Sequence, residues 1–279
     1  ETWTMDAKLV EDALARAQAE NRLPKAIVPT DLYGQSVDLN WFEALAAPYG
    51  VSLIVDSAES FGAFYRGSRK AGSGGDAAVL SFNGNKIITT SGGGAFVADD
   101  EDAARKVRYL ATQAREPVRH YEHVEVGFNY RLSNVLAALG SSQLSTLATR
   151  VARRRVVHDL YGEAFQDLAG VQVADRFRPD DSLRGDEPSR WLTCLILDPS
   201  THGVVRDSLI DALERQDIES RPVWKPMHLQ PIHAGSPILG GDVAGDAFER
   251  GVALPSGSGL SDADIQRVIE AVEGCVKAR

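Results

Sequence analysis

Residues 51–60 read Val-Ser-Leu-Ile-Val-Asp-Ser-Ala-Glu-Ser, so a compact apolar run ends at an acidic residue, Asp56. A helical pattern over residues 39–49 leads into this run, and a second apolar run over residues 77–82 follows it. Short apolar runs bounded by turn residues are typical of buried strands, and strands that alternate with helices are typical of a parallel sheet. The stretch therefore predicts an α/β fold in which Asp56 stands at the carboxyl end of a central strand.

The same alternation extends along the chain in both directions from this stretch. The pattern predicts helices over residues 5–20 (capped by Thr4), 39–49, 102–113, 133–151 with a continuation to 168, 204–216 and 262–276. It predicts strands over residues 26–29, 51–55, 77–82, 95–98 and 191–197. We expect a large domain over residues 1–150, which holds the mostly parallel central sheet, and a smaller C-terminal α/β domain over residues 151–279 with a polar loop at 175–189.

Charge and cysteine usage limit the classes of partner and the compartment. The 279 residues carry a formal net charge of −9, which argues against binding to nucleic acid or to an anionic membrane surface. No apolar run approaches the roughly 20 residues of a membrane span. The two cysteines, Cys194 and Cys275, have no metal-ligand spacing, and they fit a reducing cytoplasm. A cluster of arginines over residues 150–155 is interpreted as a solvated helix face rather than an anion site.

Three stretches carry residues that could take part in binding or catalysis. Asp56 ends a predicted strand, and ligands of open α/β sheets bind at that edge. Lys86 follows the glycine-containing loop Ser-Phe-Asn-Gly-Asn of residues 81–85, and the glycine-rich residues 89–94 come directly after it. Each has an ordinary reading when taken alone: a helix cap for Asp56, a solvated lysine for Lys86 and a common flexible stretch for the glycines. Their occurrence together in one chain favours a ligand site.

These stretches and three others resemble the sugar-nucleotide aminotransferases of the DegT/StrS family. The matching sequences are Leu-Tyr-Gly-Gln at 32–35, Asp-Ser-Ala-Glu at 56–59, residues 81–94, Gly-Phe-Asn-Tyr-Arg at 127–131 and Arg-Pro-Val-Trp-Lys-Pro-Met-His at 221–228. The resemblance covers essentially the whole chain, and its motifs occur in the family's order. Within the family the chain looks most similar to the branch that makes UDP-4-amino-4,6-dideoxy-N-acetylglucosamine for the bacillosamine pathway.

The resemblance implies a fold, a cofactor and a reaction. The fold is that of PLP-dependent transferases of fold type I, and the cofactor is pyridoxal 5'-phosphate (PLP). The implied enzyme is a cytoplasmic homodimer with shared active sites. It moves an amino group, expected to come from glutamate, to a 4-keto-6-deoxy hexose of a nucleotide sugar. This reaction belongs to polysaccharide biosynthesis.

The resemblance also assigns roles to individual residues. Lys86 is expected to attach PLP covalently and then to shuttle a proton, while Asp56 pairs with the pyridine nitrogen. Ala58 is expected against one face of the ring. Ser81 is expected to bind the cofactor's phosphate, and Asn129 to reach the phosphate of the other subunit.

Four further residues have open assignments. Glu59 stands where many family members carry Gln or His beside the phenolic oxygen of the cofactor. A carboxylate there would repel that oxygen, so we expect Glu59 either to have a raised pKa or to contact the substrate. Trp224, Lys225 and His228 either contact the nucleotide or belong to a structural turn, and the sequence does not decide between the two.

Other readings make different predictions. The family has an N-terminal segment before the point where this sequence begins, and the alternative function is a truncated, non-catalytic member that only dimerises or binds a partner. A sugar 3-dehydratase of the same fold is disfavoured, because that branch replaces the lysine with histidine and Lys86 is present. A nicotinamide dehydrogenase is disfavoured because no strand–glycine-loop–helix fingerprint occurs. No metal site is expected, because the six histidines show no ligand spacing.

Overall fold

The computed structural model describes residues 3–174, 186–240 and 242–277. Its first sheet contains β1 (Ala26–Ile27), β2 (Ser52–Asp56), β5 (Ala77–Ser81) and β6 (Gly94–Val97), in the order β1-β2-β5-β6. The pairs β1–β2 and β2–β5 are parallel, and β6 joins the edge antiparallel to β5. This confirms the predicted α/β class with a mostly parallel central sheet.

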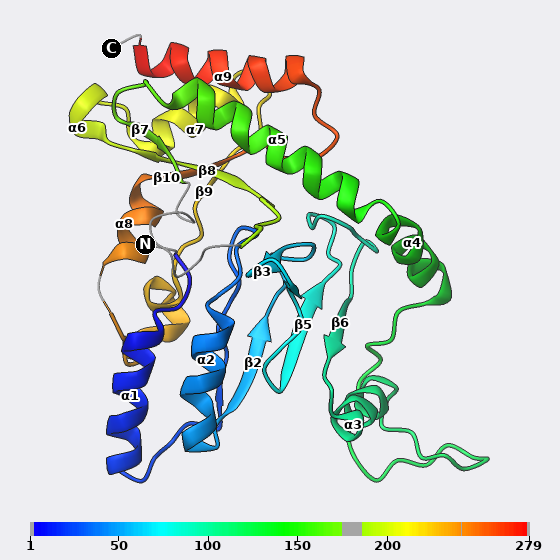
Figure 1. Ribbon diagram of the computed structural model, residues 1–279. Coiled ribbons are helices and arrows are strands. Elements are labelled where there is room, and N and C mark those ends of the chain that lie inside the picture. The colour runs from blue at the N-terminus through cyan, green and yellow to red at the C-terminus, as the bar shows by residue number, and fades with distance from the viewer. Residues whose placement is uncertain (1–2, 175–185, 241, 278–279) are drawn as a thin grey trace.

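Two helices cover one face of this sheet (Figure 1). In α1 (Ala7–Ala19) and α2 (Leu39–Ala46), residues such as Leu14 and Phe42 pack against Leu53 and Val55 of β2. The cap of α1 is Asp6 and not Thr4 as predicted: Asp6 immediately precedes the helix, and its carboxylate accepts from two backbone N–H groups of the first turn.

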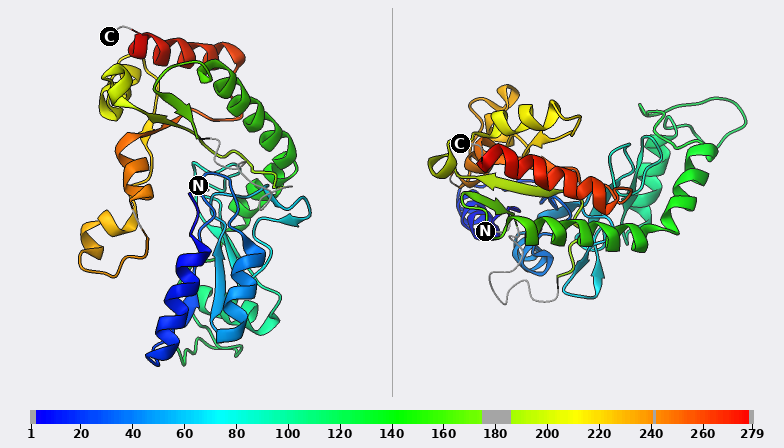
Figure 2. Two further views of the ribbon diagram at one scale, coloured as in Figure 1. Left: turned by 60° about the vertical axis from the view of Figure 1, so that its left-hand side comes forward. Right: turned by 90° about the horizontal axis from the view of Figure 1, so that it is seen from above.

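The second sheet is antiparallel throughout. It contains β7 (Val171–Val173), β8 (Thr193–Leu197), β10 (Gly251–Leu254) and β9 (Arg221–Pro222), in the order β7-β8-β10-β9. One face packs on α5 (Leu147–Phe165), α7 (Arg206–Glu214) and α9 (Asp262–Lys277), and α5 and α9 lie side by side over it (Figures 1 and 2). The other face packs on α8 (Val243–Arg250) and on Tyr33, so this sheet borders the first one.

The remaining elements are short or peripheral. They are the hairpin β3 (Phe64–Tyr65) and β4 (Arg69–Lys70), the helices α3 (Glu101–Ala111) and α6 (Pro199–His202), and the 3-10 turns η1 (Ala47–Tyr49), η3 (Met227–Leu229) and η4 (Pro231–His233). Among the described ranges, no helix is both long and apolar enough to cross a membrane.

The long helix predicted from residue 133 onward is two helices, α4 (Asn134–Leu144) and α5. At the break, the hydroxyls of Ser145 and Thr146 donate to the carbonyls of Ser142 and Gln143. Such local side-chain bonds compete with the regular helical ladder and bend or end helices.

The predicted domain boundary between residues 150 and 151 falls inside α5, which runs from α4 to the second sheet (Figure 1). The division into two domains stays a prediction.

Arginines of α5 fasten the helix to distant loops. Arg154 is only 7% exposed, and its guanidinium donates to the carbonyls of Trp191 and Ser256. Burial lowers the pKa of Arg154 to about 10. Arg153 donates to the carbonyl of Leu260, at 2.7 Å. The predicted solvated helix face is therefore wrong for Arg154, because tertiary packing brings carbonyl acceptors over that side of the helix.

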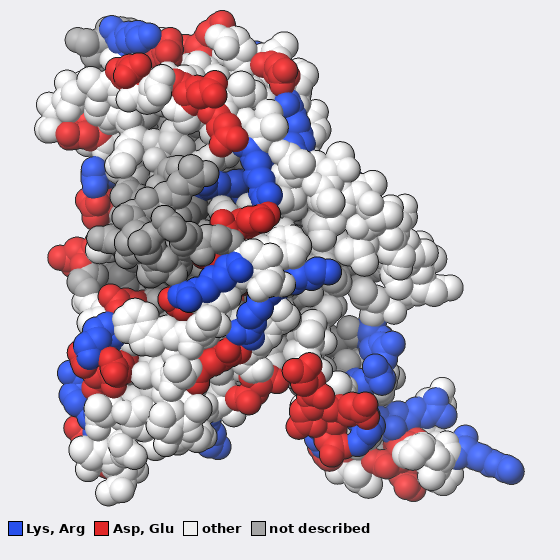
Figure 3. Space-filling model, in the orientation of Figure 1, with Lys and Arg blue, Asp and Glu red and all other residues white. Residues whose placement is uncertain are grey.

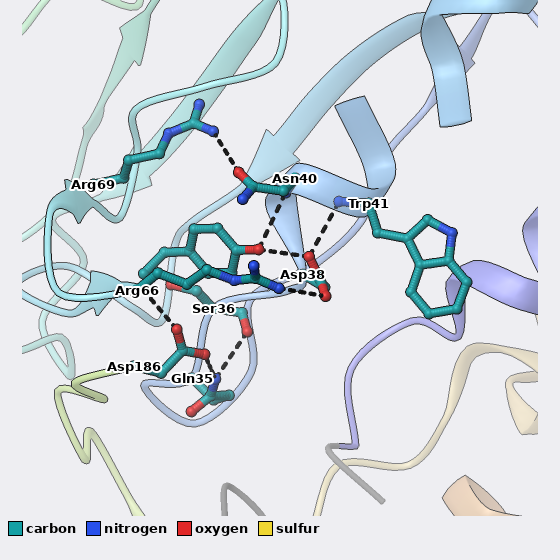
Figure 4. Close-up of polar contacts among 9 residues, drawn as sticks. Gln35, Ser36, Asp38, Asn40, Trp41, Arg66, Arg69 and Asp186 are labelled. Atoms are coloured by element: carbon teal, nitrogen blue, oxygen red, sulfur yellow. Dashed lines mark hydrogen bonds and ion pairs between the residues drawn. The ribbon is translucent and has the colours of Figure 1, made fainter. Parts of the chain in front are cut away.

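A polar cluster fixes the segment that enters the second sheet (Figure 4). The Asp186 carboxylate accepts from Gln35 Nε2 at 3.0 Å and from the backbone N–H of Arg66 at 2.7 Å. Nearby, the hydroxyl of Tyr65 donates to Asp38 at 2.5 Å. Asp186 of the predicted loop is thus bonded to Gln35 and Arg66, which lie next to the first sheet. Residues 175–185 of that loop lie outside the described residues.

Candidate active site

The carboxyl ends of β2 and β5 lie side by side and carry two predicted site residues. Asp56 ends β2 and is paired with Val79 of β5, and Ser81 ends β5 two residues later. Alternate residues of a strand share a face, so Asp56 and Ser81 stand on the same face of the sheet. The Asp56 carboxylate accepts from the backbone N–H of Ala58 at 3.1 Å, which keeps half-buried Ala58 beside it.

A folded-back loop holds Lys86 near this edge. The backbone N–H of Lys86 donates to the Asn83 carbonyl at 3.1 Å, and that of Thr90 donates to Phe82 at 2.9 Å. Lys86 Nζ lies 3.7 Å from Glu59 Oε1, and both side chains are 14% exposed. Nζ also lies 4.0 Å from the centroid of the Trp191 ring. Lys86 is therefore not a solvated surface lysine.

Glu59 is held by two donors besides Lys86. Its carboxylate accepts from the backbone N–H of Tyr33 at 3.0 Å and from Trp224 Nε1 at 3.1 Å. Burial raises the pKa of Glu59, while the hydrogen bond from Tyr33 and the nearby Lys86 charge act in the opposite direction. A raised pKa was one of the two expectations for this residue.

Sequence reasoning missed Trp191 and Tyr33 as residues around this pair, and it proposed Trp224 only as a contact to the nucleotide. Trp191 donates its indole N–H to the Asn85 carbonyl at 3.0 Å, which fixes the ring beside Lys86. The rings of Trp224 and Tyr33 stack with centroids 5.6 Å apart, and the backbone N–H of Trp224 donates to the Tyr33 hydroxyl at 2.8 Å. Tyr33 and Trp224 were part of recognised motifs, but nothing local in the sequence places them against Glu59.

Asp31 is a further missed residue, and a signal for it existed. It follows β1 as Asp56 ends β2, so the same strand-end argument would have found it. Buried Asp31 accepts from the hydroxyls of Ser57 and Ser60 at 2.8 and 2.6 Å, and from the backbone N–H of Val37 at 2.9 Å. Burial raises its pKa to about 6. These bonds fix the loop that carries Asp56 and Glu59.

The structure does not bring the other predicted residues to the same place. Asn129 is exposed and pairs with Thr112 through a single antiparallel bridge, on a segment that extends away from the first sheet (Figure 1). Lys225 is exposed next to Trp224, and His228 is half-buried in η3. Within the described ranges, no three His, Cys, Asp or Glu side chains are grouped so that they could hold a metal ion.

Residues 1–273 match the sequence model of the DegT/DnrJ/EryC1/StrS aminotransferase family. The chain belongs to this family. A putative pyridoxal phosphate-dependent aminotransferase, EpsN of Bacillus subtilis, is 44% identical over 274 residues, which cover 97% of this chain and 68% of EpsN. A GDP-perosamine synthase of Caulobacter vibrioides is 39% identical, over 89% of this chain and 65% of that protein. The chain thus spans about two thirds of the length of these relatives.

Solved structures of the DegT/DnrJ/EryC1/StrS family have the same fold. An aminotransferase of this family from Brucella abortus superposes with a TM-score of 0.85 at 28% identity, over 99% of this chain and 71% of that one. DesI, solved in the presence of its TDP-sugar product, has a TM-score of 0.84 at 27% identity, over 100% of this chain and 68% of that one. The predicted family is confirmed, and its cofactor is PLP. An amine, a carboxylate and a hydroxyl at one sheet edge fit that cofactor.

Proposed function

We propose that this chain carries the active site of an aminotransferase that moves an amino group from glutamate to a 4-keto-6-deoxy hexose of a nucleotide sugar. The observation that supports this most is the position of Lys86, a half-buried amine 3.7 Å from Glu59 at the edge where Asp56 and Ser81 end their strands. A lysine so placed can attach an aldehyde and exchange protons with a bound substrate.

Each of the proposed cofactor-binding residues has a distinct task. PLP, when bound, supplies the electron sink for amino-group transfer. The Asp56 carboxylate holds a proton at the pyridine nitrogen, since an anion beside that nitrogen favours its charged form. The Ser81 hydroxyl donates to the phosphate, and the small side chain of Ala58 leaves room for the ring.

Lys86 and Glu59 are the proposed proton-handling pair. Lys86 Nζ would move a proton between the α-carbon of the substrate and C4' of the cofactor. Burial raises the pKa of Glu59, so this residue can take up a proton beside the phenolic oxygen, while its carboxylate form pairs with Lys86 Nζ. Such proton uptake would account for a carboxylate in a position where Gln or His is common.

The proposed substrate is a nucleotide diphosphate sugar. Relatives support the class: three are named GDP-perosamine synthase, and DesI was solved in the presence of its TDP-sugar product. We propose that Lys225 and His228 contribute to binding the nucleotide part, since their segment begins at Trp224 beside Glu59. The closer likeness to the bacillosamine branch stays a prediction, because these relatives carry other names.

We also propose that the enzyme is a homodimer. Exposed apolar residues lie on α4 and on the extended segment before it; together we call them the α4 surface, and they are Val118, Tyr121, Val124, Val126, Phe128, Tyr130, Val135, Leu139 and Leu144. Figure 3 shows α4 as a face without charged side chains. Large apolar side chains exposed in this number support an interface here. A second copy covering it would take Asn129 toward the partner's cofactor.

The cytoplasm is the proposed compartment. Both cysteines are free thiols, Cys194 buried and Cys275 half-buried, and free thiols persist in reducing surroundings.

Cofactor attachment tests the proposal directly. The chain is mixed with PLP, its visible absorbance is recorded, and borohydride is added to fix the cofactor to its lysine. We expect a visible band and a modified Lys86. Lys86→Ala should lose both, whereas Lys70→Ala, which removes an exposed lysine, should keep both. With a band present, glutamate and a nucleotide-linked 4-keto sugar should yield the amino sugar; absence of the band in the unaltered chain would favour the non-catalytic alternative.

A further inference from the structure

Trp224 connects the two sheets at the candidate site. It follows β9 of the second sheet by two residues, yet its side chain contacts Glu59 and Tyr33, which lie next to the first sheet. The contact joins residues 165 positions apart in the sequence. The inference below concerns this contact and rests on the function proposed above.

The geometry fixes the indole from several directions. Trp224 Nε1 lies 3.1 Å from Glu59 Oε1 and 3.4 Å from Oε2, so one N–H faces both oxygens. The ring stacks on Tyr33 and lies 6.2 Å from the ring of Trp191. The backbone N–H of Trp224 donates to the Tyr33 hydroxyl. The indole therefore has little freedom to turn away from the carboxylate.

This fixed donor limits where the Glu59 carboxylate can lie. Its other partners are the Tyr33 backbone N–H, at 3.0 Å from Oε2, and Lys86 Nζ, at 3.7 Å from Oε1. Without the indole, Oε1 would keep only the longer contact to Lys86, and the side chain could rotate toward solvent. Because a hydrogen bond to the charged form favours that form, the indole also opposes protonation of Glu59.

We propose that Trp224 is a positioning residue for the aminotransferase site: its indole N–H holds the Glu59 carboxylate against Lys86 Nζ. Trp224 itself need not touch the reacting atoms. It acts through Glu59, so its effect should disappear when Glu59 is replaced. The second sheet thereby contributes to the proton-handling pair, although Lys86 and Glu59 both follow strands of the first sheet.

The first experiment needs no cofactor. The titration of Glu59 is followed by NMR through the backbone amide of Tyr33, which donates to its carboxylate. In Trp224→Phe the ring remains but the N–H is gone, and the midpoint should move to higher pH by about one unit. Glu59→Gln should abolish the titration. Trp41→Phe, which alters an exposed tryptophan of α2, should leave the midpoint where it is.

The second experiment measures turnover with PLP bound. Trp224→Phe should lower kcat/KM by about tenfold, the equivalent of one charge-assisted hydrogen bond. The double variant Glu59→Ala, Trp224→Phe should be no slower than Glu59→Ala alone, because the indole then has no acceptor at residue 59 to hold. Thermal midpoints of all variants separate this effect from loss of folding.

Two results would overturn the inference: an unchanged Glu59 midpoint in Trp224→Phe, or additive losses in the double variant. If the unaltered chain binds no PLP, the proposed function fails for this chain. The Tyr33 amide titration still decides whether Trp224 positions Glu59.

Discussion

Ser60 Oγ lies 2.6 Å from Asp31 Oδ2, and Ser57 Oγ lies 2.8 Å from the same oxygen. These two bonds tie the loop after β2 to the end of β1, and the loop carries Ala58 and Glu59 between the two serines. The carboxylate is buried and yet fully supplied with donors, since its other oxygen accepts from Val37. The Asp31 carboxylate therefore holds the loop of the candidate site in place, although Asp31 is not itself one of the proposed site residues.

Asp31 should make the chain less stable as pH rises. Its pKa is about 6 in the folded chain against an ordinary 3.8, so between these values the folded state holds a proton that the unfolded state has released. Stability from this group is therefore complete below about pH 4 and lost as pH rises through 6, by about 3 kcal/mol. Asp31→Asn should flatten this part of the curve. Urea unfolding at several pH values measures it; parallel curves for the two proteins would contradict the expectation.

Gly34 should not tolerate a side chain. Its φ is +99°, and a Cβ there would lie 2.6 Å from the backbone nitrogens of Arg190 and Trp191. Gly34→Ala should cost more than about 2 kcal/mol and displace Trp191 from Lys86. Gly50→Ala is the matched control: φ is +62°, but nothing lies within 4 Å of the added Cβ. It should cost about 1 kcal/mol. Chemical unfolding of both variants measures the difference, and equal losses would argue against the steric explanation.

Arg154→Ala should be strongly destabilising. The change leaves the carbonyls of Trp191 and Ser256 without their donor and opens a cavity where a 7% exposed side chain was packed. We expect a loss of about 3 kcal/mol or more. Arg105→Ala, which removes a 63% exposed arginine side chain from α3, should change stability by less than about 0.5 kcal/mol. Thermal unfolding compares the two, and similar midpoints would show that the buried arginine is dispensable.

A charge on the α4 surface should disrupt the proposed homodimer. Val126 is 82% exposed in the single chain, and a glutamate there would be buried unpaired if a second copy covers it. Val126→Glu should weaken self-association by at least about tenfold, as measured by sedimentation equilibrium. Ile232→Glu changes a residue that is 86% exposed outside this surface and should leave association unaltered. The opposite ranking of the two variants would place the interface elsewhere.

Much of the fold follows from local patterns. The apolar runs over residues 51–55 and 77–82, and the helical pattern over residues 39–49, predict strands and a helix within a few residues of their observed ends. The break between α4 and α5 was missed, although it is caused by local bonds of Ser145 and Thr146, because both residues are also compatible with a continuing helix. The antiparallel second sheet was not anticipated, since three of its four strands have only two to four residues.

By itself the sequence determined that Asp56 ends one strand and that Lys86 follows another, because side-chain periodicity and turn residues act over a few positions. The tertiary structure alone decided what surrounds them. Glu59 meets Tyr33 and Trp224 across separations of 26 and 165 residues, and Arg154 meets Trp191 across 37. Such contacts depend on how the two sheets pack, which burial of apolar surface decides for the chain as a whole. No local pattern records that outcome.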